Sequence, residues 1–162
     1  MALEIERKFL VKADTQSWMK LASASSIRQG YLCDDVKRSV RVRIAEQSAF
    51  LTIKGQTEGM SRHEFEYAIP LDDAEHLLSM CVHSIIIKTR YTLNIDGLIW
   101  EIDEFHHDNK GLIVAEVELD HVEQQISLPE WIASEVTDDP RFYNLALCQH
   151  PYNLWVKTEL ET

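Results

Sequence analysis

Acidic residues two positions apart open this sequence, in Glu4-Ile5-Glu6-Arg7-Lys8. In a β-strand, alternate residues point to the same face, so Glu4, Glu6 and Lys8 would share one surface. The two carboxylates would then lie roughly 7 Å apart. Such carboxylates repel each other, and folding gains nothing from that repulsion. A cation between them is therefore the natural interpretation.

The same spacing recurs along the chain, and each pair keeps one sign of charge. The acidic pairs are Glu64 and Glu66, Glu101 and Asp103, and Glu116 and Glu118; the basic pairs are Arg41 and Arg43, and Lys88 and Arg90, with Lys54 as a further base. The simplest interpretation of one such strand is a wet, charged face of an antiparallel sheet. A solvent face, however, usually mixes the two signs, because neighbouring like charges are destabilising. The repeated pattern instead favours a sheet with a charged interior, which would hold carboxylates for a divalent metal and bases for a polyanion.

Alternation and turn residues predict the elements that would carry these pairs. Eight strands are expected at Leu3–Val11, Ile27–Leu32, Val40–Glu46, Ala49–Lys54, Arg62–Ile69, Ser84–Ile95, Leu98–Phe105 and Leu112–Asp120. Asp96-Gly97 is a strong hairpin turn. A cap at Asp14 or Thr15 would begin a short helix at Ser17–Leu21, and the helical spacing of apolar residues predicts a helix at Leu71–Met80.

The last part of the chain, about 129–162, has a different pattern and is expected to be a helical segment of the same single domain. A helical turn is predicted at Trp131–Val136 and a short helix at Phe142–Cys148, which ends before Pro151. The fold class is therefore α+β, mainly β. Eight strands joined by short turns can close into an antiparallel β-barrel. Helices packed outside would bury its apolar exterior and leave a hydrophilic tunnel.

Composition and charge exclude several classes of protein. The chain has 162 residues, 45% of them hydrophobic, which fits one globular domain rather than a disordered chain. No apolar run approaches the ~20 residues that a membrane span needs, and the N-terminus has no signal-peptide pattern. The three cysteines are widely spaced, as expected of reduced thiols in a cytoplasmic protein. The net charge of -11 argues against binding to nucleic acid or to an anionic membrane.

Taken in order, these segments resemble a known family. Glu4-Ile5-Glu6-Arg7-Lys8 is similar to the Glu-x-Glu-x-Lys signature of the CYTH domain, the triphosphate tunnel metalloenzymes. The resemblance continues through Arg28–Leu32, Arg41–Arg43, Thr52–Lys54, Arg62–Glu66, Lys88–Tyr91, Glu101–Asp103, Glu116–Glu118, Glu135–Thr137 and Arg141–Ala146. It covers nearly the whole chain and is closest to the compact bacterial inorganic tripolyphosphatases. One departure is visible: the family commonly reads Arg-Tyr-x-Asn where this chain has Arg141-Phe142-Tyr143-Asn144.

The resemblance implies an eight-stranded tunnel that hydrolyses inorganic tripolyphosphate to pyrophosphate and phosphate with Mg²⁺ or Mn²⁺. The implied metal ligands are Glu4, Glu6, Glu116 and Glu118. The implied phosphate-binding residues are Lys8, Arg41, Arg43, Lys54, Lys88 and Arg90. The residues expected to be catalytic are Glu4 and Glu6 from the metal ligands and Lys8 and Lys88 from the phosphate-binding residues. The remaining acids, Glu64, Glu66, Glu101 and Asp103, would orient the bases, bind a second metal or position water.

Other activities remain open from the sequence. The substrate could be an organic triphosphate, either thiamine triphosphate or a nucleoside triphosphate, or the protein could be a class IV-type adenylate cyclase. It could also bind polyphosphate or nucleotides without turning them over. The paired glutamates argue against that last function, because binding an anion does not require them. The expected partner is a small-molecule triphosphate, and the apolar exterior could support a homodimer.

Overall fold

The structure, a computed structural model, describes residues 5–14, 16–56 and 62–155. Strands make up most of this part of the chain. They are β1 (Ile5–Val11), β2 (Ser23–Asp35), β3 (Arg38–Ala45), β4 (Ser48–Gly55), β5 (Glu64–Ile69), β6 (Val82–Ile95), β7 (Leu98–Phe105), β8 (Ile113–Leu119) and β9 (Ile132–Glu135). The helices are α1 (Leu71–Ser79) and α2 (Asn144–Gln149), with short 3-10 turns η1 (Ser17–Leu21), η2 (His107–Asn109), η3 (Pro140–Phe142) and η4 (Tyr152–Leu154).

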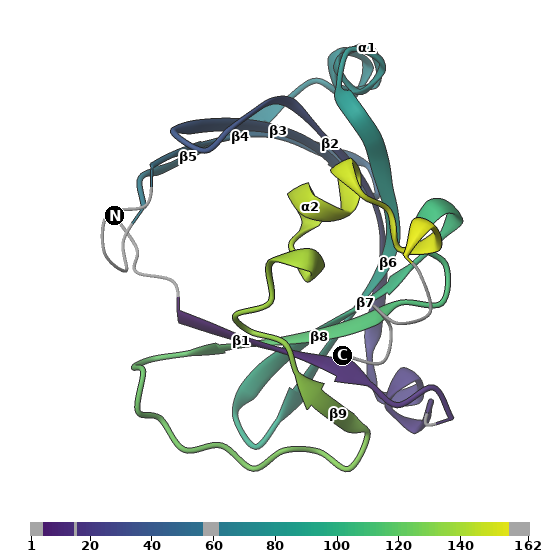
Figure 1. Ribbon diagram of the computed structural model, residues 1–162, viewed down its shortest axis with the longest axis vertical. Helices are drawn as coiled ribbons and strands as arrows, with labels where there is room; N and C mark the ends of the chain where they lie inside the picture. The colour runs from purple at the N-terminus through teal and green to yellow at the C-terminus, as the bar shows by residue number, and fades with distance from the viewer. Residues whose placement is uncertain (1–4, 15, 57–61, 156–162) are drawn as a thin grey trace.

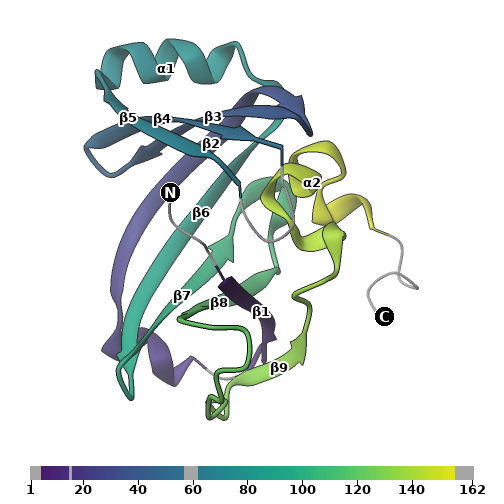
Figure 2. The same ribbon diagram turned by 90° about the vertical axis from the view of Figure 1, so that its left-hand side faces the viewer.

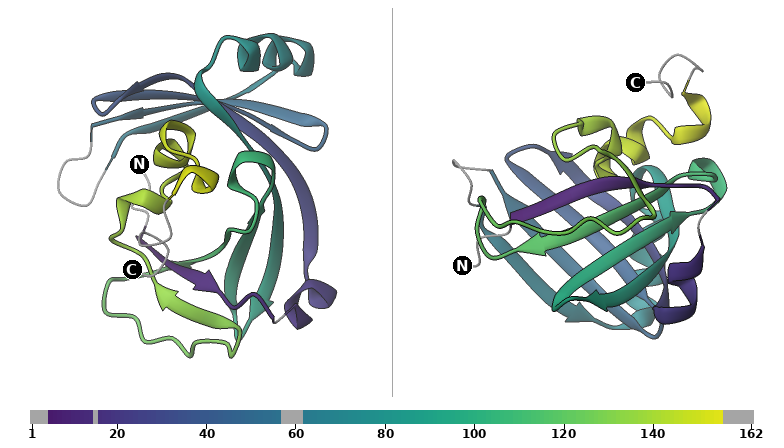
Figure 3. Two further views of the ribbon diagram at one scale, coloured as in Figure 1. Left: turned by 45° about the vertical axis from the view of Figure 1, so that its right-hand side comes forward. Right: turned by 90° about the horizontal axis from the view of Figure 1, so that it is seen from below.

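All nine strands of the described residues belong to one antiparallel sheet, in the order β5-β4-β3-β2-β6-β7-β8-β1-β9. The sheet curls strongly, so that its concave side surrounds a central space (Figure 1). Within the described residues no ladder joins the edge strands β5 and β9. The barrel-like tunnel predicted from the sequence is therefore confirmed in its architecture. Its wall is a curled sheet, and within the described residues the two edge strands are not hydrogen-bonded to each other. Two further views show the tilted strands side by side (Figure 3).

The ninth strand corrects the helical turn predicted at Trp131–Val136. β9 pairs with the second half of β1, where Phe9 lies opposite Glu135 and Val11 opposite Ile132. Arg7 adds a bidentate contact to Glu135, with nitrogen–oxygen distances of 3.0 and 2.7 Å. Tertiary pairing with the free edge of β1 decides this conformation, because four residues are too few to show an alternating pattern. The predicted helical segment is thus part strand and part helix in its described portion.

Two apolar clusters lie on the convex side of the sheet. The first includes Phe9, Trp100, Val117 and Trp131 together with Trp18 of η1. Helix α1 covers β2, β3 and β4 through Ala74 and Leu78, as Figure 2 shows. Both α1 and η1 therefore pack outside the sheet, as the sequence predicts. Their packing buries apolar residues that alternate with charged ones on β1, β3, β7 and β8, whereas Phe65 and Tyr67 on β5 stay exposed.

The third cluster lies on the concave side and differs from the expectation that helices pack only outside. Helix α2 sits inside the curve of the sheet and contacts β6 and β2 (Figure 1). Its Leu147 and Cys148 pack against Tyr31, Ile86 and neighbouring apolar residues. The inner face of these strands is therefore apolar at the end that α2 covers and charged beyond it. This division leaves the charged side chains around a cavity of limited extent.

Candidate active site

The charged part of the concave side surrounds a cavity of about 620 Å³. Its lining contains six basic side chains, which are Lys8, Arg41, Arg43, Lys54, Arg62 and Arg90. It also contains six acidic side chains, which are Glu6, Glu64, Glu66, Glu101, Glu116 and Glu118. The i, i+2 spacing places these residues together, because every second residue of each strand faces the same side. The predicted charged interior is thus present among the described residues.

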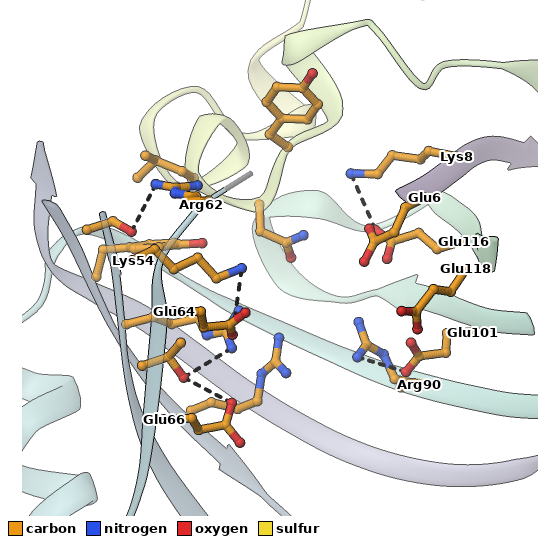
Figure 4. Close-up of a pocket in the computed structure, with 18 of the residues that line it drawn as sticks. Glu6, Lys8, Lys54, Arg62, Glu64, Glu66, Arg90, Glu101, Glu116 and Glu118 are labelled. Atoms are coloured by element: carbon orange, nitrogen blue, oxygen red, sulfur yellow. Dashed lines mark hydrogen bonds and ion pairs between the residues drawn. The ribbon is translucent and has the colours of Figure 1, made fainter. Parts of the chain in front are cut away.

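Four of the acidic side chains lie on β1, β7 and β8, namely Glu6, Glu101, Glu116 and Glu118, while Glu64 and Glu66 lie on β5. In the strand register Glu6 lies opposite Glu118, and Glu116 lies opposite both Lys8 and Glu101. The close-up in Figure 4 shows these carboxylates pointing into the cavity from one side. Two bases moderate their repulsion. The Nζ atom of Lys8 is 3.4 Å from a carboxylate oxygen of Glu116, and a terminal nitrogen of Arg90 is 3.0 Å from Glu101.

Three of the basic side chains, Arg41, Arg43 and Lys54, lie on β3 and β4, on the opposite side. A terminal nitrogen of Arg41 donates to the hydroxyl of Thr52, and that hydroxyl donates to Glu66, each at 3.3 Å. The Nζ atom of Lys54 lies 4.0 Å from a carboxylate oxygen of Glu64. The Nε atom of Arg41 is buried and has no hydrogen-bond partner among the described residues. An unsatisfied buried donor of this kind is costly, so an anion that accepted its hydrogen bond would stabilise the site.

Arg62 joins the basic side of the cavity from the residues just before β5. Its Nε atom donates to the backbone carbonyl of Gly55 at 2.6 Å, which holds the side chain near the end of β4. Its place in the cavity was missed from the sequence, although Arg62 precedes Glu64 by two residues and therefore shares its face. The spacing rule that identified the other charged residues would have found it.

Two predicted residues lie behind the cavity rather than along it. Lys88 is 1% exposed, and its Nζ donates to Asp103 at 2.8 Å and to the side-chain oxygen of Asn144 at 3.0 Å. Asp103 also accepts two hydrogen bonds from Arg90, at 2.8 and 2.9 Å. Asp103 therefore orients two bases, one of which faces the cavity. The structure does not bring Lys88 to the cavity surface, because α2 covers that end of the strand.

Burial and charge shift the pKa values of this group in opposite directions. Burial lowers the pKa of Lys88 to about 8, against the opposing attraction of Asp103. Burial alone would raise the pKa of Asp103, but the charges of Lys88 and Arg90 hold it well below its usual range. Burial would also lower the pKa of Arg90, but the hydrogen bonds with Asp103 raise it. Asp103 is thus a carboxylate held between two cations.

Arg43 lies in a different electrostatic environment. Burial, together with the nearby charges of Arg41 and Arg90, lowers its pKa to about 10. Its Nε atom donates to the side-chain oxygen of Gln29 at 2.7 Å, so a neutral amide rather than a carboxylate holds it. The positive charge on this side is therefore incompletely neutralised. A bound polyanion would relieve the repulsion between these guanidinium groups.

Of the predicted site residues, Glu6, Lys8, Arg41, Arg43, Lys54, Glu64, Glu66, Arg90, Glu101, Glu116 and Glu118 line the cavity. Glu4 lies outside the described residues. Uncharged residues that the sequence did not single out complete the lining, namely Tyr31, Ser39, Thr52, Thr137, Tyr143, Asn144 and Leu145. Tyr143 directly precedes α2, and Asn144 and Leu145 form its start. The phenol ring of Tyr143 lies over Lys8, with Nζ 5.1 Å from the ring centre.

The donor set on the acidic side fits a hard divalent cation. No three acidic, histidine or cysteine side chains among the described residues already converge as a ready metal site. Mg²⁺ does not require such a cage, because it commonly binds one or two carboxylates, several waters and phosphate oxygens of the substrate. Glu6, Glu116 and Glu118 supply oxygen ligands beside the basic side chains. Their chemistry therefore suits a metal that binds together with a phosphate compound.

Comparison with known proteins identifies the family. The sequence profile of the CYTH domain matches residues 2–143. This chain belongs to the CYTH family. It is 42% identical over 153 residues to an inorganic triphosphatase of Acetivibrio thermocellus, a match that covers 94% of this chain and 97% of the relative. It is 35% identical over 149 residues to an inorganic triphosphatase of Nitrosomonas europaea, covering 89% and 95% of the two chains.

A solved structure has the same fold as this CYTH protein. The crystal structure of the inorganic triphosphatase NE1496 superposes with a TM-score of 0.71 and 32% sequence identity. The match covers 96% of this chain and 97% of that one. The curled sheet is thus shared over almost the full length of both. None of the described helices is long and apolar enough to cross a membrane.

Proposed function

We propose that this CYTH protein hydrolyses inorganic tripolyphosphate to pyrophosphate and phosphate, and that it uses Mg²⁺ or Mn²⁺. The observation that carries the proposal is the cavity itself, in which acidic and basic side chains of equal number face one shared space. Two relatives named as inorganic triphosphatases, at 42% and 35% identity, support the same substrate.

The basic side would bind the phosphate groups. Arg41, Arg43 and Lys54 come from adjacent strands, and Arg62, before β5, and Arg90, on β6, add to the set. Guanidinium groups match phosphate oxygens with two parallel hydrogen bonds, while ammonium groups act as point charges. The small volume and the many bases fit a short polyanion better than a nucleic acid strand, which the net charge of -11 also opposes.

The acidic side would hold the metal. Glu6, Glu116 and Glu118 are the described residues that would bind it, and when bound it would neutralise phosphate charge and lower the pKa of a bound water. Glu64 and Glu66 lie beside Lys54 and Thr52 and would orient the bases on the opposite side. Arg41, Arg43 and Lys54 would thus bind phosphate across the cavity from the metal, while Lys8 would bind phosphate beside the metal ligand Glu116.

The reaction would need positioning and charge neutralisation more than covalent chemistry. The basic residues would fix tripolyphosphate with one terminal phosphorus towards the acidic side. A water oxygen would form a bond to that phosphorus, and the bond from phosphorus to the bridging oxygen would break. A lining carboxylate would accept the proton of the water. Pyrophosphate would carry away the bonding electron pair, with its charge balanced by the arginines.

Phosphate release from the purified protein tests this function. Tripolyphosphate, ATP and thiamine triphosphate are compared, each with Mg²⁺, with Mn²⁺ and with EDTA. We expect release from tripolyphosphate that depends on the metal and exceeds release from both organic substrates. A preference for ATP or thiamine triphosphate would replace the substrate assignment with an organic triphosphatase. Binding of all three compounds with no release under any condition would overturn the enzymatic assignment.

A further inference from the structure

Gln29 on β2 is fully buried, and both the oxygen and the nitrogen of its side-chain amide form hydrogen bonds. Its side-chain oxygen accepts the hydrogen bond from Nε of Arg43 at 2.7 Å. Its side-chain nitrogen donates to the oxygen of Asn144 at 3.1 Å. Both partners line the cavity, whereas Gln29 lies behind them. A polar side chain at this depth is stable only while its hydrogen bonds are made.

The contact with Asn144 connects Arg43 to the buried ion pairs. The same oxygen of Asn144 accepts a hydrogen bond from Lys88, whose Nζ also donates to Asp103. Asp103 in turn accepts from Arg90. A continuous chain of side-chain hydrogen bonds therefore runs from a cavity base on β3 to a cavity base on β6. Gln29 and Asn144 are its uncharged members.

The uncharged nature of Gln29 has a chemical consequence. Arg90 is held by Glu101 and Asp103, so its positive charge is largely balanced by the protein. Arg43 is held by an amide, which fixes the direction of the guanidinium without neutralising it. An arginine oriented in this way keeps its full charge for an anionic ligand. Burial lowers the pKa of Arg43, and the nearby charges of Arg41 and Arg90 lower it further.

We propose that Gln29 is a positioning residue of the phosphate-binding site, which orients Arg43 through its amide oxygen and links it through Asn144 to the Lys88–Asp103–Arg90 cluster. The proposal rests on the proposed function, because it assigns to Arg43 a phosphate group of the substrate. Gln29 itself does not touch the substrate. Its role depends on two properties together, hydrogen bonding in a fixed direction and the absence of charge.

Two variants separate these properties. Gln29→Met keeps the size of the side chain but leaves Arg43 without its acceptor, so we expect KM for tripolyphosphate to rise about tenfold or more with a smaller change in kcat. Gln29→Glu keeps an acceptor for Arg43 but adds a negative charge. Its KM is expected to rise at neutral pH and to recover towards the wild-type value as the carboxylate takes up a proton. Gln149→Met on α2 is the matched control, because Gln149 contacts Asp34 outside the cavity.

The outcomes distinguish this proposal from the proposed function. Wild-type protein that releases no phosphate overturns the function, and calorimetric binding of tripolyphosphate in EDTA then still measures the effect of Gln29 on affinity. Unchanged KM or Kd in both Gln29 variants overturns the positioning role. Equal increases of KM in Gln29→Met and Gln29→Glu that do not change with pH would show that Gln29 only supports the packing.

A measurement on the wild-type protein does not depend on how the Gln29 variants fold. The proton on Nε of Arg43 is observed by nitrogen-15 NMR and assigned by its loss in Arg43→Lys. We expect it to exchange with water at least tenfold more slowly than that of Arg38, which is exposed on the same strand. Equal exchange rates would show that Gln29 does not hold Arg43, and would overturn the proposal.

Discussion

The Nζ atom of Lys8 on β1 lies 3.4 Å from a carboxylate oxygen of Glu116 on β8, and the strand register places these two residues directly opposite each other. The proposed function gives them different ligands, phosphate for Lys8 and the metal for Glu116. Without ligands each balances the charge of the other. When metal and tripolyphosphate bind, Lys8 would contact a phosphate group and Glu116 would contact the metal. These two contacts would offset the free energy needed to separate Lys8 from Glu116.

Glu116→Gln tests the acidic side of that relationship. The amide keeps the shape of the side chain but loses the charge that a divalent cation requires, so we expect metal-dependent turnover to fall by about 100-fold or more. Initial rates over a range of Mn²⁺ and Mg²⁺ concentrations measure the loss. Glu104→Gln is the control, because Glu104 also lies in this region of the sheet but is not among the lining residues. Full activity of Glu116→Gln at wild-type metal concentrations would contradict the assignment.

Arg41→Ala tests the basic side. Arg41 lines the cavity and has a buried Nε without a partner in the described part of the chain. Hydrogen bonds to charged groups contribute about 1.5–3 kcal/mol, which corresponds to an increase in KM of about 10- to 150-fold. Steady-state kinetics with tripolyphosphate measure the KM of Arg41→Ala and of the control Arg38→Ala, which lies at the exposed start of the same strand. If both variants have the same KM, Arg41 does not bind the substrate.

The sequence predicted the face of each charged residue better than its depth. Lys88 and Arg90 lie two positions apart on β6 and share a face, yet Arg90 lines the cavity and Lys88 lies beneath it. The difference comes from Asn144 at the start of α2, which covers Lys88 and accepts its hydrogen bond. A period of two residues shows which side of a sheet a residue faces. It carries no information on what a distant segment places over it.

The C-terminal segment was the least predictable part for the same reason. Strand β9 forms because β1 offers it an edge, and α2 stays inside the sheet because Leu147 and Cys148 meet an apolar inner surface. The departure from the family pattern at Phe142 and Tyr143 also becomes clear only in three dimensions. Phe142 packs edge-on against Trp155, with ring centres 5.2 Å apart, while Tyr143 lines the cavity. The hydroxyl at position 143 therefore belongs to the cavity-lining residue.

Asp103→Asn tests the buried ion pairs through stability. The substitution leaves Lys88 and Arg90 buried beside a neutral group, so we expect the free energy of unfolding at pH 7 to fall by about 3–5 kcal/mol. The pKa of Asp103 is lowered in the folded protein, so its stabilisation is complete above the unfolded pKa of about 3.9. It is lost as the pH falls further, towards the folded pKa.

Urea unfolding of the wild type and of Asp103→Asn between pH 2.5 and pH 7 measures this dependence, as far as both remain folded. The difference between them should shrink as the pH falls below about 4, where Asp103 takes up a proton. Asp108→Asn, an exposed position, should differ from the wild type by less than about 0.5 kcal/mol throughout. A difference that grows as the pH falls below about 4 would have the wrong sign for a carboxylate stabilised by cations.

Leu147→Ala tests whether packing of α2 positions the cavity residues that precede it. Leu147 is fully buried among Tyr31, Ile86 and other residues of the inner apolar cluster. Its truncation should lower the free energy of unfolding by about 2–5 kcal/mol. Because the same segment carries Tyr143 and Asn144 to the cavity, KM for tripolyphosphate should rise as well, at temperatures where the variant is folded. Leu154→Ala, 61% exposed on η4, should change neither quantity appreciably. A variant that loses stability but keeps the wild-type KM would show that the cavity holds its shape without support from α2.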